Sequence, residues 1–369
     1  MISKPTPQDW YYIENIDAMD SPALAIYPER ILSNIYKMIE VVGDVNRLRP
    51  HVKTHKMSEV VQMQIDAGIW KFKCATIAEA EMLGDLEVQD VLIAYQPVGP
   101  TIGRVFKLIQ KYPQTRFSIL VDDQENVKTI AALSQKLEAS ISVFLDIDVG
   151  MHRTGIAPDR ALGLYSFCES MSGIQPIGLH AYDGHVHHEN AELRRNAAAE
   201  VNEIIDKLYN DLDKQLEVVV SGSPSFPYHA ERKKYTCSPG TSLLWDWRYG
   251  NMCEDQEFLH AAVVIARVIS KPGFKYICVD LGHQSIASEM PFPRVHFINL
   301  PDATQVKHSE EHLVLEVADN TSIHLGDVLY GIPMHICPTV ALHESVSVIE
   351  HKTIVDSWEV VARKRKITL

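Results

Sequence analysis

The sequence lacks the features of several common protein classes. Its six cysteines are scattered and include no Cys-x-x-Cys pair. We therefore expect no disulfide framework, and most of these thiols should be small buried side chains. No run of about 18 apolar residues occurs, and the first residues contain no apolar signal core, so a cytoplasmic protein is expected. There is also no internal repeat or low-complexity segment.

Positive charge is in short supply as well. Lys and Arg total 35 against 48 Asp and Glu, which gives a formal net charge of −13. Nucleic acids and anionic membranes bind basic surfaces, so neither is expected as a partner. A small zwitterionic ligand is still compatible with this charge. The 369 residues exceed the usual size of one hydrophobic core, which predicts two domains.

The first domain is expected to be a parallel α/β barrel. Between about residues 45 and 240, apolar segments alternate with amphipathic ones, as at Ile102, Val105 and Phe106. Gly68 is placed to end one of these helices. Eight strands alternating with helices are typical of a (β/α)₈ TIM-like barrel, and a doubly wound sheet is the alternative. The expected strands are 48–52, 72–75, 91–95, 117–121, 141–147, 176–182, 218–220 and 235–237.

The second domain is expected to be mainly β. After about residue 255, strand-like segments follow one another with turns between them. The N-terminal run 22–26 is also strand-like and is placed to pair with this C-terminal sheet. We therefore expect the barrel to span residues 27–250 and the β domain to combine 1–26 with 251–369. The expected C-terminal strands are 259–269, 276–279, 313–317, 324–329, 345–349 and 353–361.

Polar side chains collect at the carboxyl ends of the predicted barrel strands, where barrel active sites lie. Singly, each has an ordinary interpretation as a solvated lysine, a polar turn or a satisfied histidine loop. Their convergence on one barrel face indicates an active site. A lysine among other cations is expected to have a lowered pKa, which favours the free amine needed for a Schiff base, and Lys53 is the candidate. Segments 221–225 and 238–241 offer N–H groups and hydroxyls suited to a phosphate.

The motif Arg-Pro-His51-Val-Lys53-Thr-His-Lys resembles the alanine-racemase-type pyridoxal 5′-phosphate (PLP) enzymes. More narrowly, the chain resembles the D-threonine aldolase and D-serine dehydratase branch. The likeness covers nearly the whole chain and is most specific in the lysine motif together with Pro333-Met-His335-Ile-Cys337-Pro-Thr. Further matching segments are 20–24, 76–81, 92–95, 148–155 and 309–312.

The resemblance implies a role for each of these residues. Lys53 would form the Schiff base with PLP and then act as a proton-transfer base. Arg153 would lie near the phenolic oxygen of the cofactor, and Tyr182 near its pyridine ring or nitrogen. His335 and Cys337 would bind a divalent metal, zinc or manganese. The full set of implied cofactor-binding residues is His51, Lys53, Arg153, Tyr182, Ser221, Gly222, Ser223, Gly240 and Thr241.

The metal pair also has support of its own. Two residues apart on a strand, His335 and Cys337 would point the same way and could share one ion. A His/Cys pair suits Zn²⁺ and leaves coordination positions open for water and substrate. For an isolated His-x-Cys, a buried thiol beside a hydrogen-bonded histidine is the commoner arrangement. The family context favours the metal here.

Two features depart from the pattern or stay open. Gln284 stands where many members of the branch carry a lysine. His185, His187 and His188 form a histidine-rich run, of which His185 is the best placed to touch substrate or metal.

The expected activity is that of a PLP- and metal-dependent lyase acting on D-3-hydroxy amino acids such as D-serine, D-threo-3-hydroxyaspartate or D-threonine. It would be a dehydratase or an aldolase, and Cys337 as second metal ligand tilts the expectation toward a dehydratase. One alternative is an amino-acid racemase of the same fold, which would need no metal. The other is a non-catalytic PLP-binding homeostasis protein, which is typically a single barrel. Family analogy suggests a homodimer in which one subunit's C-terminal domain completes the other's site.

Overall fold

The computed structural model describes residues 2–369, except for the side chain of Ser221. Backbone contacts divide the chain into two compact units, each described here by itself. The barrel unit comprises residues 36–53, 61–240 and 364–369, and the β unit comprises the residues up to Ile35, 54–60 and 241–363. No helix in the described part of the chain is both long enough and apolar enough to cross a membrane.

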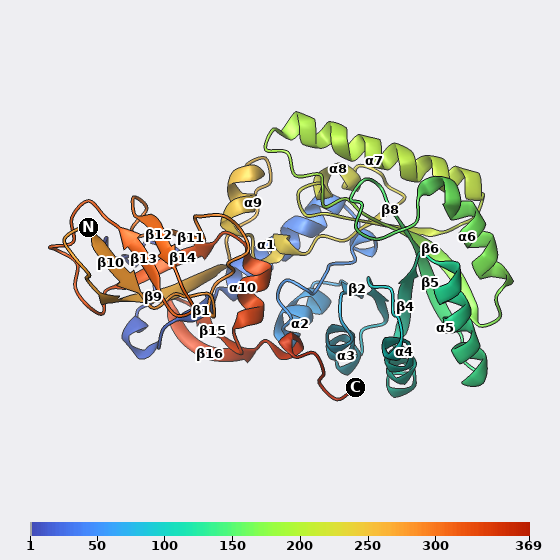
Figure 1. The fold of residues 1–369 in the computed structure, drawn as a ribbon, viewed down its shortest axis with the longest axis horizontal. Helices are drawn as coiled ribbons and strands as arrows, with labels where there is room; N and C mark the ends of the chain where they lie inside the picture. The colour runs from blue at the N-terminus through green and yellow to red at the C-terminus, as the bar shows by residue number, and fades with distance from the viewer. Residues whose placement is uncertain (1) are drawn as a thin grey trace. The chain divides into compact units, whose positions relative to one another are not determined.

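The barrel unit is built on a curled parallel sheet whose strands follow chain order (Figure 1). This order fits the predicted TIM-like barrel and rules out the doubly wound sheet, in which the strand order reverses. Within residues 2–369, seven of the eight predicted strands are present, with ends shifted by two residues at most. They are β2 (Lys71–Cys74), β3 (Asp90–Ile93), β4 (Arg116–Val121), β5 (Ile141–Ile147), β6 (Ile174–Tyr182), β7 (Glu217–Ser221) and β8 (Tyr235–Cys237).

The first of the predicted barrel strands, 48–52, was wrong as a regular strand. This segment makes only single bridges, from Leu48 to Cys237 on one side and from His51 to Lys73 on the other. Because Pro50 has no N–H, it cannot donate to a strand ladder. Val52 N–H still donates to the Lys73 carbonyl at 2.9 Å. The segment therefore lies between β8 and β2 and joins the two edges of the sheet.

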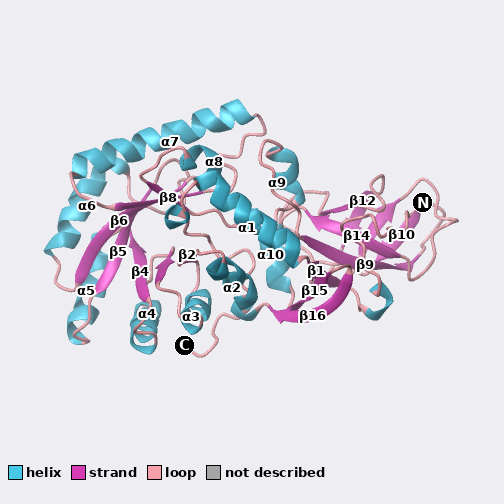
Figure 2. Ribbon diagram, turned by 180° about the vertical axis from the view of Figure 1, so that it is seen from behind, coloured by secondary structure: helices cyan, strands magenta, loops and turns pink. Residues whose placement is uncertain are grey.

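Helices cover the outer face of this sheet, and α3 to α6 line up along it in Figure 2. The Thr76 hydroxyl caps α3 by accepting the Glu79 N–H, and the Asp123 carboxylate caps α5 in the same way through Asn126. Gly68 follows α2 at a φ of +93°, as expected of a terminating glycine. The helices of this region are α1 (Pro28–Val42), η2 (Val45–Arg47), α2 (Ser58–Asp66), α3 (Ile77–Asp85), α4 (Pro100–Lys111), α5 (Gln124–Lys136), α6 (Pro158–Ser170), α7 (Ala191–Leu212) and α8 (Phe226–Ala230).

A buried ion network lies at the amino ends of the barrel strands. The fully buried Arg49 guanidinium donates to Asp90 at 2.7 Å and to Glu217 at 3.0 Å. Lys71 from β2 also reaches Glu217, at 2.8 Å. A buried charge is tolerated when it is paired in this way, so the network ties segment 48–52 to β3 and β7.

The β unit contains a mainly antiparallel sheet into which the N-terminal strand is inserted. As predicted, β1 pairs with the C-terminal sheet, lying parallel to β15 and antiparallel to β9. Ala25, Val263 and Ile265 pack with Tyr11 and Tyr330 in its core. The strands are β1 (Ala23–Ile26), β9 (Ala262–Ser270), β10 (Tyr276–Val279), β11 (Val295–Phe297), β12 (Thr304–His308), β13 (Leu313–Glu316), β14 (Val328–Pro333), β15 (Ser345–Glu350) and β16 (Thr353–Glu359).

Three details of the β unit differ from expectation. Residues 324–327 form a turn rather than the start of a strand, because the Asp327 carboxylate accepts the His324 N–H at 2.8 Å and Gly326 has a φ of +90°. The short strands β11 and β12 were not predicted. A helix, α10, also follows β14. The helical segments of the unit are η1 (Ile16–Ala18), η3 (Thr241–Leu243), α9 (Trp247–Met252), α10 (Ile336–Leu342) and η4 (Val361–Arg363).

Candidate active site

A cavity of about 570 Å³ lies in the barrel unit among the carboxyl ends of its strands. Four predicted site residues, His51, Lys53, Arg153 and Tyr182, line it. The other lining residues are Lys73, Ala75, Ala94, Tyr95, Gln96, Val98, Leu120, Asp122, Asp146, Thr154 and His180. Its position is that of a barrel active site.

The Tyr182 ring lies close to two cationic side chains, Lys53 and Arg153. The Lys53 Nζ is 5.4 Å from the centre of the Tyr182 ring, and the Arg153 guanidinium carbon is 4.7 Å from it. Both distances are in the range in which a cation is attracted to an aromatic face. The backbone N–H of Lys53 donates to His51 Nδ1 at 3.2 Å. The His51 side chain thus fixes the backbone of Lys53, just after the last bridge between this segment and β2.

The turn that carries Arg153 is fixed by carboxylates. Asp148 accepts the N–H groups of Gly150 and His152, both at 3.0 Å. Gly155 has a φ of +104°, and a Cβ there would lie 2.6 Å from the Asp148 backbone nitrogen. Only glycine fits so close to another backbone at such a φ. Residues 148–155 follow the pattern Asp-x-Gly-x-x-Arg-x-Gly. Asp148 and Gly155 of this pattern are therefore needed for the tight turn that presents Arg153 to the cavity.

Sequence reasoning missed a second lysine in the cavity. Lys73 on β2 is 2% exposed, and its Nζ lies 3.5 Å from His180 Nε2. His180 Nδ1 lies 2.7 Å from an Asp146 oxygen. The other Asp146 oxygen accepts the Thr154 hydroxyl at 2.9 Å. Burial holds the pKa of Lys73 well below its usual value; the charge of Lys53 lowers it further, and Asp146 opposes the shift.

The predicted phosphate loops lie near each other but are not among the residues that line this cavity. Gly240 N–H donates to the Ser223 hydroxyl at 3.3 Å. Gly222 has a φ of +151°, and a Cβ there would lie 2.3 Å from an Asp183 carboxylate oxygen and 2.5 Å from the Ser225 hydroxyl. Ser221 ends β7, and its side chain lies outside the described part of the structure. Glycine is required at 222 by these neighbours.

His185, His187, His188 and Gln284 are also not among the residues that line the cavity. His185 covers the turn glycine Gly150, whose added Cβ would be 3.0 Å from the His185 Nε2. The His187 ring lies 3.3 Å from the Gly184 carbonyl, and the His188 carbonyl accepts from Arg194. Gln284 has an exposed side chain in the β unit. The contacts of the three histidines are thus with neighbouring segments of the barrel unit.

The predicted metal pair is in the β unit, but not on a strand. His335 is the N-cap residue of α10, and Cys337 lies in the first turn of that helix. The expectation that the two side chains point the same way from a strand was therefore wrong, because β14 ends at Pro333 and the chain turns into a helix. The two side chains still interact. Burial would lower the pKa of His335, but the Cys337 thiol and the Glu289 carboxylate outweigh it and raise this pKa to about 9.

The surroundings of the pair are polar. His335 Nδ1 lies 2.5 Å from a Glu289 oxygen. The Cys337 Sγ is 3.2 Å from the Thr54 hydroxyl and 3.6 Å from the Thr241 hydroxyl, so this is where the predicted phosphate residue Thr241 points. Across residues 2–369 no group of three or more His, Cys, Asp and Glu side chains is arranged to hold a metal ion.

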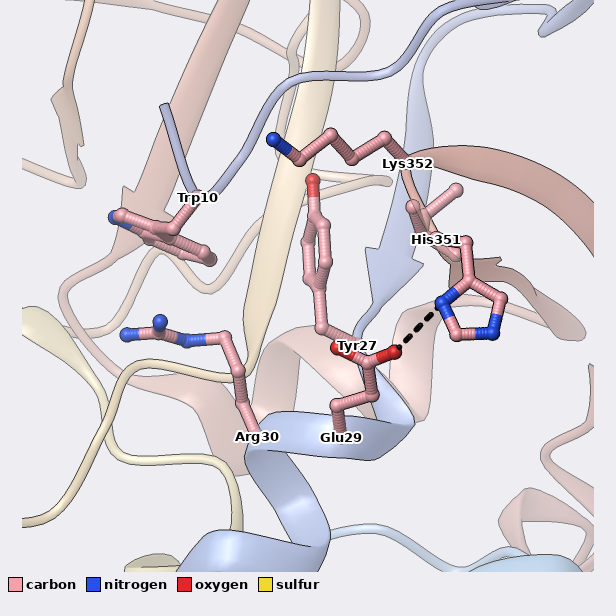
Figure 3. Close-up of a pocket in the computed structure, with 7 residues that line it drawn as sticks. Trp10, Tyr27, Glu29, Arg30, His351 and Lys352 are labelled. Carbon is pink, nitrogen blue, oxygen red and sulfur yellow. Dashed lines mark ion pairs between the residues drawn. The ribbon is translucent and has the colours of Figure 1, made fainter. Parts of the chain in front are cut away.

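A second cavity, of about 440 Å³, lies within the β unit. Figure 3 shows its charged side chains around Tyr27. Arg30 lies over the Trp10 ring at 4.0 Å and donates to the His260 carbonyl at 2.5 Å. His351 and Glu29 form an ion pair at 3.2 Å, drawn as a dashed line. These charges are engaged with protein partners, which indicates a structural role.

Comparison with protein-family models gives two matches. Residues 26–245 match "Alanine racemase, N-terminal domain", and residues 261–349 match "Putative serine dehydratase domain". The chain belongs to the alanine racemase N-terminal domain family. The first match spans more than half of the sequence, and the predicted family is confirmed. Members of this fold family carry PLP, so the family implies that cofactor.

Full-length relatives place the chain within this family. It is 29% identical to D-threonine aldolase of Arthrobacter sp, covering 86% of this chain and 85% of that protein. It is 26% identical to 3-hydroxy-D-aspartate aldolase of Paracoccus denitrificans, covering 96% of each. A crystal structure of D-threonine aldolase from Filomicrobium marinum superposes with a TM-score of 0.86 at 25% identity. The match covers 93% of this chain and 95% of that one. The predicted enzyme class, lyase, and the fold class are confirmed.

Proposed function

We propose that the chain is a PLP- and divalent-metal-dependent lyase that acts on D-3-hydroxy amino acids. The observation that carries the proposal is the barrel cavity, which gathers Lys53, Arg153 and Tyr182 at the carboxyl ends of the strands. Relatives of the chain include a D-threonine aldolase, a 3-hydroxy-D-aspartate aldolase and a D-serine dehydratase, whose names specify such substrates.

The residues present fit PLP. A volume of about 570 Å³ is within the usual range for a small-molecule site. The cavity offers a lysine amine for covalent attachment, a guanidinium for an anionic oxygen and an aromatic ring against which a pyridine can pack. When bound, PLP supplies an electron sink for the bonds at the substrate Cα.

The chain's own groups then bind, orient and move protons. Lys53 would hold the cofactor and, once displaced by the substrate amine, move the Cα proton. Arg153 would hold the phenolic oxygen, with its turn fixed by Asp148. Tyr182 and His51 would set the position of the ring. Segments 221–223 and 240–241 would hold the phosphate through backbone N–H groups and hydroxyls.

His335 and Cys337 would hold the divalent metal. A nitrogen and sulfur donor pair suits Zn²⁺, with Mn²⁺ the alternative, and a metal there would supply a Lewis acid for the substrate β-hydroxyl. Solved structures of a D-threo-3-hydroxyaspartate dehydratase include a variant with alanine for a histidine, and another, in the metal-free form, with alanine for a cysteine two positions later. The spacing of His335 and Cys337 is the same.

Both hydroxyl partners of Cys337 directly follow proposed cofactor residues in the sequence. Thr54 follows Lys53, and Thr241 follows Gly240. We also propose a homodimer, in line with the family analogy.

Dehydration and aldol cleavage are the two reactions that fit. Dehydration removes the Cα proton and the β-hydroxyl to give a 2-oxo acid and ammonia, whereas aldol cleavage breaks Cα–Cβ to give glycine and an aldehyde. Cys337 favours dehydration, as argued from the resemblance.

The test is product analysis with D-serine, D-threonine and D-threo-3-hydroxyaspartate, with and without added metal. Pyruvate from D-serine supports a dehydratase, and glycine with acetaldehyde from D-threonine supports an aldolase. Inversion of the substrate without either product, in metal-free protein, would overturn the proposal in favour of a racemase.

A further inference from the structure

Lys73 has a setting unusual for lysine. It lies on β2, at one end of the strand order of the barrel sheet, is 2% exposed and lines the same cavity as Lys53. Lysine is almost never fully buried unless its charge is paired. Here the amine lies 3.5 Å from a ring nitrogen, His180 Nε2.

The tautomer of His180 follows from its other partner. Asp146 can only accept at His180 Nδ1, so Nδ1 carries the proton and Nε2 presents a lone pair. The Lys73 amine can therefore donate one N–H to Nε2 and keep its remaining valences toward the cavity. His180 is 4% exposed and Asp146 6% exposed, so the three linked side chains Lys73, His180 and Asp146 are largely buried.

Charges of both signs face the Lys73 amine. Lys53 and Arg49, on the segment beside β2, oppose a positive charge on Lys73. Asp146 from β5 and Asp183 after β6 favour it. Burial is the largest influence and favours the neutral amine, whose pKa is held low. A new negative charge in the cavity would reverse that balance, because opposite charges attract strongly in a poorly solvated site.

We propose that Lys73 is an anion-responsive site: its buried amine, which lies beside His180 Nε2, takes up a proton when an anionic, phosphorylated pyridine ligand enters the cavity. This inference rests on the proposed function, since it assumes that the cavity receives PLP. Lys53 would then be left for covalent attachment while Lys73 balances ligand charge. His180 and Asp146 position the amine and receive part of its charge through the hydrogen-bonded chain.

The test uses pyridoxine 5′-phosphate, which lacks the aldehyde and cannot react with Lys53. Calorimetric titration of the full-length apoprotein in buffers of different ionisation enthalpy gives the number of protons taken up on binding. At mildly alkaline pH the wild-type protein should take up about one proton more than Lys73→Met, by proton linkage. Lys73→Met should also bind the analogue about tenfold more weakly, as expected for one lost charge partner.

Two further variants keep the test decisive. Lys73→Arg carries a permanent charge, so it should retain affinity yet lose the extra proton uptake, even if Lys73→Met fails to fold. Lys71→Met, on the same strand but in the ion network with Glu217, should keep the wild-type uptake. Equal uptake in the wild-type protein and Lys73→Arg would overturn this inference and leave the proposed function standing. Absence of any binding to the wild-type protein would overturn the proposed cofactor site, and this inference with it.

Discussion

The Lys53 amine lies 5.4 Å from the centre of the Tyr182 ring. The ring comes from the end of β6 and the amine from the segment after Pro50, so the fold brings together two groups 129 positions apart (182 minus 53).

We expect Tyr182 to act through its ring. Tyr182→Phe should retain PLP affinity within about twofold, whereas Tyr182→Leu should lose about tenfold, as expected for one ring contact worth roughly 1 kcal/mol. Fluorescence titration of the apoprotein measures both; equal loss in the two variants would assign the effect to the hydroxyl.

Glycine at 222 should be required by space. Gly222→Val would drive a side chain into the Asp183 carboxylate, displace the loop and sharply weaken PLP binding. The control is Gly43→Val. Gly43 also has a positive φ, of +72°, but no atom lies within 4 Å of a Cβ added there. Both variants carry backbone strain, and only the first should lose cofactor. Unchanged cofactor retention in Gly222→Val would remove this loop from the phosphate site.

The metal pair should be separable from the cofactor. Chelation, His335→Ala and Cys337→Ala should each abolish turnover while leaving the absorbance of the bound cofactor, because Lys53 attaches it without the metal. Cys337→Asp should keep partial activity, since a carboxylate is also a competent ligand. Cys278→Ala, at a buried thiol of the same unit, serves as the control. Full activity in exhaustively chelated, metal-analysed protein would refute the metal role and favour the racemase alternative.

Glu217 should make stability depend on pH. Burial alone would raise its pKa, but Arg49 and Lys71 outweigh it and lower this pKa to about 2. A carboxyl with a depressed folded-state pKa stabilises the fold above its ordinary pKa of 4.5, and this contribution is lost as pH falls toward 2. Glu217→Gln should therefore cost about 2–3 kcal/mol at neutral pH and flatten the acid limb of the stability profile.

Urea unfolding at a series of pH values measures this dependence. The control is Glu125→Gln, which removes an exposed pair with Lys128 and should change stability by under about 0.5 kcal/mol. A parallel acid profile for the wild-type protein and Glu217→Gln would show that the buried network contributes nothing through this carboxylate.

Local sequence pattern predicted most of the barrel and little of its interior. Apolar segments between helical ones sufficed for β2 to β8, and a strand-like run sufficed for β1. Segment 48–52 failed because Pro50 interrupts a ladder that composition alone suggests. Cys337 was placed on a strand because a short helix of seven residues gives no periodic signal.

Lys73 was missed for a different reason. In the sequence Lys-Phe-Lys-Cys it alternates like an outward-facing polar residue, and lysine is normally exposed. Its burial depends on His180 and Asp146, which lie far away in the sequence and approach it only when the sheet curls. By contrast, Lys53 and Arg153 follow the ends of predicted strands, where the fold class alone predicts a site.

The central claim is that Lys53 holds the cofactor. Borohydride reduction of the PLP-loaded protein followed by peptide mapping tests it directly. The reduced cofactor should be found on the peptide containing Lys53, and Lys53→Ala should lose both the label and the absorbance of the bound cofactor. The structure makes Lys73, which lines the same cavity, the rival to examine alongside Lys56. A label on Lys73 or Lys56 in the wild-type protein would contradict the account.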